Sequence, residues 1–152
     1  MLDFKLSDEQ QMLVEMTRSF VEKDMIPHEE ILETKDILPS DLATSLKKES
    51  IELGLHACNL PEEVGGGGLD AVSVMLIEKE LGRTSLALAE CAHRPLNILS
   101  ACQGKQVTEF LEPTIRGDKR DCIAMTEPEA GSDLRGMKCK AVRDEDNWLI
   151  NG

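Results

Sequence analysis

The segment AMTEPEAGSDLRG, from Ala124 to Gly136, contains residue types that can bind an anion. Gly131 can adopt a positive φ, and the side chains of Ser132 and Asp133 can cap backbone groups in a tight turn. Successive backbone N–H groups in such a turn can point at a phosphate. From these residues alone, two interpretations stay open: a structural turn and a phosphate cradle.

The residues before the turn favour the cradle. The run DCIAMTE predicts a short strand that carries Met125 and Thr126. Backbone N–H groups and one hydroxyl at the end of this strand can hold a planar ligand with hydrogen-bonding edges beside the phosphates. A flavin dinucleotide has both features, a ring edge with donors and acceptors and a pyrophosphate.

The elements that must position this turn are mainly helices. Apolar residues at helical spacing, together with capping and stop signals, predict helices over residues 6–27, 28–35, 40–55, 69–82, 84–102 and 105–117. The segment over 84–102 is apolar nearly all round, so we expect a central, buried helix with a bend at Pro95.

Several residues mark the ends of these helices. Ser7 and Gln10 have the spacing of a capping box. Ser40 or Asp41 is the expected N-cap of the third helix, and Gly54 is its expected stop. Asp70 is the expected N-cap of the fourth helix.

The pattern changes after the last helix. The segment MKCKAVRDEDNWLING predicts a strand, a hairpin turn at Asp144–Asn147 and a second strand. The sequence therefore predicts a helical domain over residues 1–120 and the beginning of a β domain over residues 121–152. So few strands do not form a stable sheet with two covered faces, and we expect a fragment of a longer protein.

Charge and composition exclude several classes of partner. The formal net charge is −12, and an acidic surface repels a phosphate backbone, so we expect no nucleic-acid partner. No apolar run approaches the about 20 residues that span a bilayer, and we expect no membrane span. The five cysteines include no C-x-x-C pair, which favours a reducing compartment and a cytoplasmic location. The three histidines have no partners at ligand spacing, so we expect no metal site.

The segment from Ile123 to Gly136 closely resembles the signature of the acyl-CoA dehydrogenases. In that signature a small or apolar pair precedes Thr-Glu, and two variable residues, a small residue and Gly-Ser-Asp follow. The matching positions are Ala124, Met125, Thr126, Glu127, Ala130, Gly131, Ser132, Asp133 and Gly136. Residues 6–27, 60–83 and 144–152 also resemble, in order, the family's first helix, its Gly-Gly loop with the following helix, and a later hairpin.

This resemblance implies a fold and a reaction. The fold is mainly α, an N-terminal up-down helical bundle followed by the first strands of an incomplete β-barrel domain. The reaction is FAD-dependent α,β-dehydrogenation of an acyl-CoA thioester, in fatty-acid or amino-acid breakdown. A carboxylate removes the α-proton as hydride passes from the β-carbon to flavin N5. Electron-transfer flavoprotein is the implied electron acceptor, and a homo-oligomer is the implied assembly.

The resemblance also implies which residues bind FAD. Backbone groups would contact the isoalloxazine from Ile123, Ala124, Met125 and Thr126, and Thr126 would add its hydroxyl. Gly131 and Ser132 would lie near the pyrophosphate, and Ser132 would also reach the CoA arm of the substrate. Family members are much longer than this chain and carry the catalytic glutamate in a C-terminal helical domain. We therefore expect no catalytic residue here, the base downstream of Gly152, and no activity from the 152-residue chain alone.

Other interpretations stay open beside this one. A flavin oxidase or monooxygenase of the same superfamily would use the same cradle, and a short helical interaction module would have no catalysis at all. We expect Glu127 and Asp133 to fix the turn rather than to do chemistry. His93 and Arg94, on the apolar helix, could contact a polar acyl group, although such a pair more often caps a helix or crosses an interface.

Overall fold

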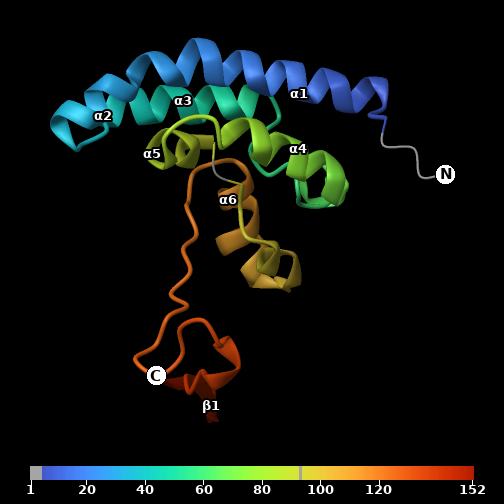
Figure 1. Cartoon of the computed structure of the whole chain (residues 1–152). Coiled ribbons are helices and arrows are strands. Elements are labelled where there is room, and N and C mark those ends of the chain that lie inside the picture. Colours follow the sequence, from blue (N-terminus) through green and yellow to red (C-terminus); the bar gives the residue numbers. More distant parts are fainter. Residues whose placement is uncertain (1–4, 93) are drawn as a thin grey trace. The chain divides into compact units, whose positions relative to one another are not determined.

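The computed structural model describes residues 5–92 and 94–152, so the hypothesis for His93 lies outside the described residues. The chain divides into two compact units, Met1–Asp121 and Cys122–Gly152. The first unit is helical, and the second contains one two-stranded sheet (Figure 1). The mainly α fold is as predicted. No helix in the described part of the chain is long and apolar enough to cross a membrane.

The first helix begins at the predicted capping box. In α1 (Asp8–Phe20), Ser7 Oγ accepts a hydrogen bond from the Gln10 N–H, and Gln10 Oε1 accepts one from the Ser7 N–H. The chain continues through a π-helical turn, Val21–Met25, and a 3₁₀ turn, Ile26–His28, into α2 (Glu29–Lys35). The helix predicted over residues 6–27 is therefore regular α-helix only as far as Phe20.

The next two helices differ in how they begin. The N-cap of α3 (Ser40–Glu52) is Pro39, so the prediction of Ser40 or Asp41 is wrong. Pro39 has the extended backbone of an N-cap, and its carbonyl oxygen accepts the first helical hydrogen bond, so the helix begins one residue early. The N-cap of α4 (Ala71–Leu81) is Asp70, as predicted. Its Oδ1 accepts hydrogen bonds from two backbone N–H groups, which lower the pKa of Asp70.

The long buried helix predicted over residues 84–102 does not form. The chain has α5 (Leu86–Ala89), a 3₁₀ turn over Glu90–Ala92 and another over Asn97–Ala101. Pro95 explains the break, since it has no N–H to donate and disfavours helical structure in the residue before it. The segment is also not buried all round, because the side chains of Leu86 and Ile98 are 76% and 72% exposed. The last predicted helix is a π-helical turn, Val107–Leu111, followed by α6 (Glu112–Ile115).

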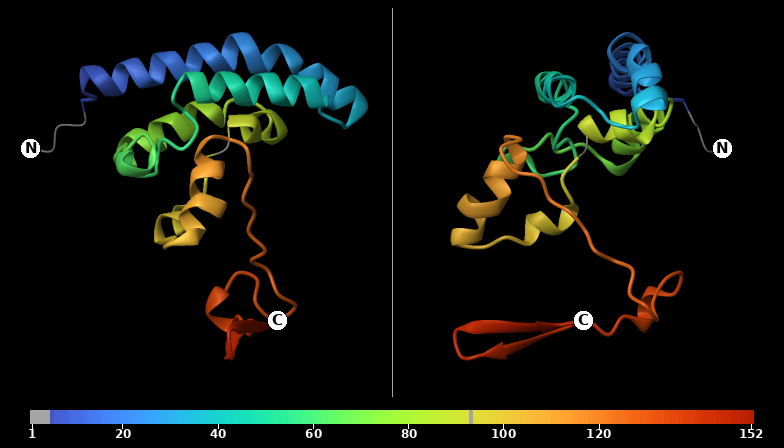
Figure 2. Two further views of the ribbon diagram at one scale, coloured as in Figure 1. Left: turned by 180° about the vertical axis from the view of Figure 1, so that it is seen from behind. Right: turned by 90° about the vertical axis from the view of Figure 1, so that its left-hand side faces the viewer.

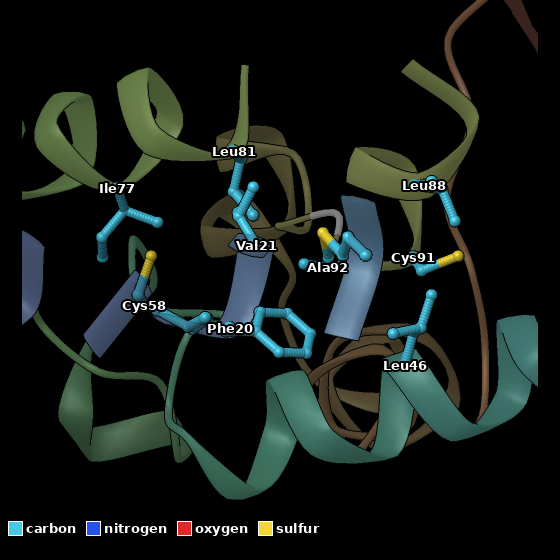
Figure 3. Close-up of a cluster of buried hydrophobic side chains, with 11 residues drawn as sticks. Phe20, Val21, Leu46, Cys58, Ile77, Leu81, Leu88, Cys91 and Ala92 are labelled. Atoms are coloured by element: carbon cyan, nitrogen blue, oxygen red, sulfur yellow. The ribbon is translucent and has the colours of Figure 1, made fainter. Parts of the chain in front are cut away.

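The core of the helical unit lies between α1, α3, α4 and α5. Figures 1 and 2 show α1 and α3 running in opposite directions, in the predicted up-down arrangement. Figure 3 shows side chains from these helices, from the turns after α1 and α5 and from the loop after α3 meeting in one buried cluster. Its labelled members are Phe20, Val21, Leu46, Cys58, Ile77, Leu81, Leu88, Cys91 and Ala92. Because each helix contributes only one face, the cluster fixes how the helices pack.

A buried carboxylate fastens α1 to α4. The Glu80 side chain is only 3% exposed. Arg18 donates to it through Nε at 3.0 Å and Nη2 at 2.9 Å, and Arg83 Nη1 donates at 3.2 Å. The hydrogen bonds from Arg18 are the main cause of the lowered pKa of Glu80. Arg83 also contacts Glu22, so the ion pairs continue toward the C-terminal end of the first helix.

The second unit contains the predicted hairpin. β1 (Lys140–Asp144) pairs antiparallel with β2 (Asn147–Asn151), with Val142 opposite Leu149. Glu145, in the two-residue turn, has a φ of 52°. The strand predicted over residues 121–127 is wrong, since that segment contains only an isolated bridge between Glu127 and Ala130. A strand needs a hydrogen-bonded neighbour, and within the described residues no strand pairs with this segment.

We expect Glu80→Gln to lower the free energy of unfolding by about 1–3 kcal/mol near neutral pH, because the substitution removes the charged acceptor of two guanidinium groups. The measurement is urea unfolding of the chain, followed by the helical circular dichroism signal. The matched control is Glu52→Gln, which removes an exposed pair with Lys48 at 3.7 Å. It should cost about 0.5 kcal/mol or less.

The pH dependence has a definite sign. Because the pKa of Glu80 is lower in the folded chain than in the unfolded chain, its contribution is fully present above about pH 4.3. That contribution is lost as the pH falls through the folded-state pKa. The difference between wild type and Glu80→Gln should therefore shrink in acid, and a constant difference would contradict the ionised Glu80.

Candidate functional site

The candidate site begins with an exposed, extended segment, Cys122–Thr126, in the second unit. Its sequence-predicted flavin-contacting residues are Ile123, Ala124, Met125 and Thr126. Within the part of the chain that the structure describes, no hydrogen bond engages their backbone N–H groups or the Thr126 hydroxyl. These donors face solvent and are available to a ligand.

A tight turn follows this segment. The Glu127 N–H donates to the Ala130 carbonyl oxygen at 3.1 Å, and the Ala130 N–H donates back to the Glu127 carbonyl oxygen at 3.1 Å. Pro128 and Glu129 make the connection between them. Ala130 is 1% exposed, which is the deepest burial in the second unit. The turn therefore has a small interior of its own.

A 3₁₀ turn, Leu134–Gly136, completes the loop. Asp133 Oδ1 accepts hydrogen bonds from the Arg135 N–H at 3.1 Å and from Arg135 Nε at 2.9 Å. The bond with the Arg135 side chain is the main cause of the lowered pKa of Asp133. The carboxylate of Asp133 thus caps this turn.

The carboxylate of Glu127 crosses the loop. Its Oε2 accepts a hydrogen bond from the Lys138 N–H at 2.7 Å, and its Oε1 accepts one from the Cys139 N–H at 3.0 Å. The Glu129 carboxylate pairs with the Lys138 ammonium. Sequence reasoning missed both backbone partners of Glu127, because they lie 11 and 12 residues away and no local capping pattern reaches that far.

Gly131 and Ser132 lie at the exposed side of the loop. Gly131 can adopt a positive φ but does not do so in this structure. The space around Gly131 is open, since a Cβ added there meets no atom within 4 Å. Among the described residues no partner engages the N–H groups of Gly131 and Ser132 or the Ser132 hydroxyl. Together these groups can donate to phosphate oxygens that approach the loop.

The helical unit has cavities of its own. One of about 480 Å³ is lined by an apolar side of α4, including Val74 and Met75, and by Asn97 and Arg94. The Arg94 guanidinium forms an ion pair with Glu78, which neutralises its charge at the cavity wall. Arg94 is therefore placed at a cavity, but as half of an ion pair.

The cysteines of the two units differ in exposure. Cys58 and Cys91 are buried in the helical unit, and burial raises the pKa of Cys58 to about 11 and also raises the pKa of Cys91. Cys122 and Cys139 are exposed in the second unit, one on each side of the candidate loop. Groups of three or more residues that could hold a metal ion are absent from the described residues.

Comparison with known proteins gives consistent matches. Residues 7–118 match the family model for the acyl-CoA dehydrogenase N-terminal domain. The probable acyl-CoA dehydrogenase YngJ of Bacillus subtilis is 35% identical, over 99% of this chain and 40% of that protein. The mitochondrial short-chain specific acyl-CoA dehydrogenase of Rattus norvegicus is 34% identical, over 97% of this chain and 36% of that protein.

A solved structure shows the same relationship. The crystal structure of an acyl-CoA dehydrogenase from Bacillus anthracis, complexed with FAD, matches with a TM-score of 0.76 and 30% identity. The match covers 100% of this chain and 26% of that one. This chain thus spans 36% to 40% of the length of the two curated relatives named above.

We expect a thiol-reactive reagent at about pH 7 to label Cys122 and Cys139 quickly and to leave Cys58 and Cys91 unlabelled, because burial keeps those two thiols protonated and inaccessible. Mass spectrometry of peptides after timed labelling gives the result. In urea all five cysteines should label at similar rates. Fast labelling of Cys58 in the native chain would contradict its burial.

Proposed function

Since this chain belongs to the acyl-CoA dehydrogenase family, we propose that its protein dehydrogenates an acyl-CoA thioester with FAD as cofactor. The observation that carries the proposal is the set of unengaged donors at Ile123–Thr126, Gly131 and Ser132, exposed on a loop that is otherwise closed by its own hydrogen bonds. Acidic side chains near these donors are already occupied, so the donors themselves are what the loop offers to a ligand.

The extended segment fits the flavin ring. In our proposal the backbone N–H groups of Ile123, Ala124, Met125 and Thr126 and the hydroxyl of Thr126 donate to the acceptor atoms along one edge of the isoalloxazine. A ligand that replaces water at exposed N–H groups costs little desolvation and gains several hydrogen bonds. Backbone groups also hold an edge rigidly, which orients the ring.

The loop tip fits the pyrophosphate. Gly131 presents its N–H without a side chain in the way, and Ser132 adds an N–H and a hydroxyl. In our proposal these groups bind the FAD pyrophosphate, and the Ser132 hydroxyl also reaches the CoA arm of the substrate. Hydrogen bonds to a charged acceptor are stronger than those between neutral groups, so a few donors suffice to bind the pyrophosphate.

The bound FAD supplies the hydride acceptor. This chain's residues hold and orient that cofactor, and we assign none of them to removal of the α-proton. All three carboxylates of the loop are engaged, Glu127 by backbone N–H groups, Glu129 by the Lys138 ammonium and Asp133 by Arg135. We therefore place the base outside the loop and, as the family resemblance implies, downstream of Gly152.

We extend the proposal to partners and location. Electron-transfer flavoprotein is the proposed electron acceptor, as the family resemblance implies. A homo-oligomer is the proposed assembly, since the hairpin exposes the apolar side chains of Val142, Trp148, Leu149 and Ile150. All five cysteines are free, which agrees with a reducing compartment such as the cytoplasm.

The direct test mixes the protein with FAD, an acyl-CoA and an electron-accepting dye, and follows reduction of the dye. We expect turnover from a protein that carries this chain together with the base, and none from the 152-residue chain alone. Loss of the base removes about 10²–10⁴-fold of rate. Steady turnover by the short chain would contradict our placement of the base.

Two substitutions test the cradle. Ser132→Ala should weaken FAD binding by about 0.5–1.5 kcal/mol, the net contribution of one hydrogen bond. Gly131→Val should weaken binding more, because its branched side chain fills the open space through which phosphate approaches. Flavin fluorescence titration measures both, with Ser100→Ala in the helical unit as the control. Unchanged affinity in both variants would exclude the loop tip from the site.

A further inference from the structure

We propose that Glu127 is a positioning residue for the flavin, one that clamps the loop and thereby sets the direction of the donors at Thr126 and Gly131. This inference rests on the proposed function. It assigns to Glu127 no contact with the reacting atoms, only the role of holding the residues that touch the cofactor.

The first argument is the place of Glu127 in the loop. It stands where the extended segment enters the turn, one residue after Thr126. Its main chain makes two hydrogen bonds with Ala130, both at 3.1 Å. Its carboxylate makes two more, at 2.7 and 3.0 Å, with the N–H groups of Lys138 and Cys139. One residue thus joins the beginning of the loop to its middle and to its end.

The second argument is that the loop closes on itself. Ala130 is buried in its interior, and a Cβ added at Gly136 would lie 3.8 Å from the Ala130 Cβ and 3.5 Å from the Glu129 carbonyl oxygen. The loop therefore has a packed centre, and the hydrogen bonds of the Glu127 carboxylate hold its two ends together around that centre. If these hydrogen bonds were lost, the backbone next to Thr126 would no longer be held in one conformation.

The third argument concerns the chemistry of the clamp. Both partners of Glu127 are N–H donors, so both oxygens must accept. A carboxylate can do this, whereas a glutamine has one oxygen and one NH₂ group, and the NH₂ would face a donor. The clamp therefore requires an ionised side chain, although the residue does no acid–base work. Among the described residues the carboxylate of Glu129, two residues later, contacts the exposed ammonium of Lys138 and no backbone N–H, so it has no such requirement.

The experiment compares Glu127→Gln with the matched control Glu129→Gln. In the 152-residue chain without FAD, amide exchange should speed up at Lys138 and Cys139 in Glu127→Gln by at least about tenfold, the factor that corresponds to 1.4 kcal/mol. Exchange in α4 should stay unchanged, which shows that the helical unit is folded. Glu129→Gln should resemble wild type. Unchanged exchange at both amides would overturn the clamp.

The second readout is the flavin. In a protein that carries this chain and binds FAD, Glu127→Gln should raise the dissociation constant for FAD by about tenfold and shift the visible flavin spectrum toward that of free FAD. Glu129→Gln should change neither. Wild-type affinity and spectrum in Glu127→Gln would overturn the positioning role and leave the proposed function standing. If the wild-type protein does not bind FAD, the proposed function fails and this inference fails with it.

A second variant tests whether the effect of Glu127→Gln comes from the clamp itself rather than from a general loss of structure. Lys138→Pro removes one N–H that Glu127 binds and leaves the Glu127 carboxylate in place; it also removes the ammonium that pairs with Glu129, a loss for which Glu129→Gln is the control. Met137 already has the φ of −57° and ψ of 133° that a residue before proline prefers. Lys138→Pro should reproduce the rise in the FAD dissociation constant, and combining it with Glu127→Gln should add little further. Full additivity of the two effects would overturn a shared clamp.

Discussion

A carboxylate removed from water must be matched by donors, and this constraint organises both units of the chain. In the helical unit the buried Glu80 accepts from Arg18 and Arg83, so α1 and α4 can pack only in a register that brings the guanidinium groups to it. In the second unit the partly buried Glu127 accepts from two backbone N–H groups, so the loop can close only in one way. In both places the charge restricts how the neighbouring groups can be arranged around it.

The candidate site consists of the donors that remain after the loop has formed its own hydrogen bonds. Within residues 122–139 the acidic side chains of Glu127 and Asp133 occupy the N–H groups that shape the loop. Among the N–H groups without a partner in the described residues are those of the extended segment and of Gly131 and Ser132, and these are the ones we assign to FAD. A loop that satisfies its own backbone on one side and leaves donors on the other is preorganised for an electron-rich ligand, because binding requires little rearrangement.

How much of this could be predicted from the sequence depends on the range of each interaction. Caps such as Ser7, Asp70 and the Gly54 stop act over a few residues, and the sequence predicted them. The predicted helix over residues 84–102 was wrong because its apolar composition does not outweigh the effect of Pro95. The predicted strand over residues 121–127 was wrong because a strand needs a hydrogen-bonded partner. The signature located the loop, but the contacts of Glu127 with Lys138 and Cys139 join residues too distant for local rules. The FAD-binding roles of Ile123–Thr126, Gly131 and Ser132 remain predictions.

The turn of the hairpin also bears on the order in which the chain folds. Glu145 adopts a left-handed conformation, which costs a residue with a side chain roughly 1–2 kcal/mol. Cross-strand pairs such as Val142 with Leu149 must offset this cost, and a lone two-stranded hairpin is marginal in water. Helices with local caps form in about 0.1–1 μs, whereas hairpins take about 1–10 μs. A single capped helix can therefore form sooner than the hairpin, and the apolar side chains of the two strands stay exposed to other molecules until another part of the protein covers them.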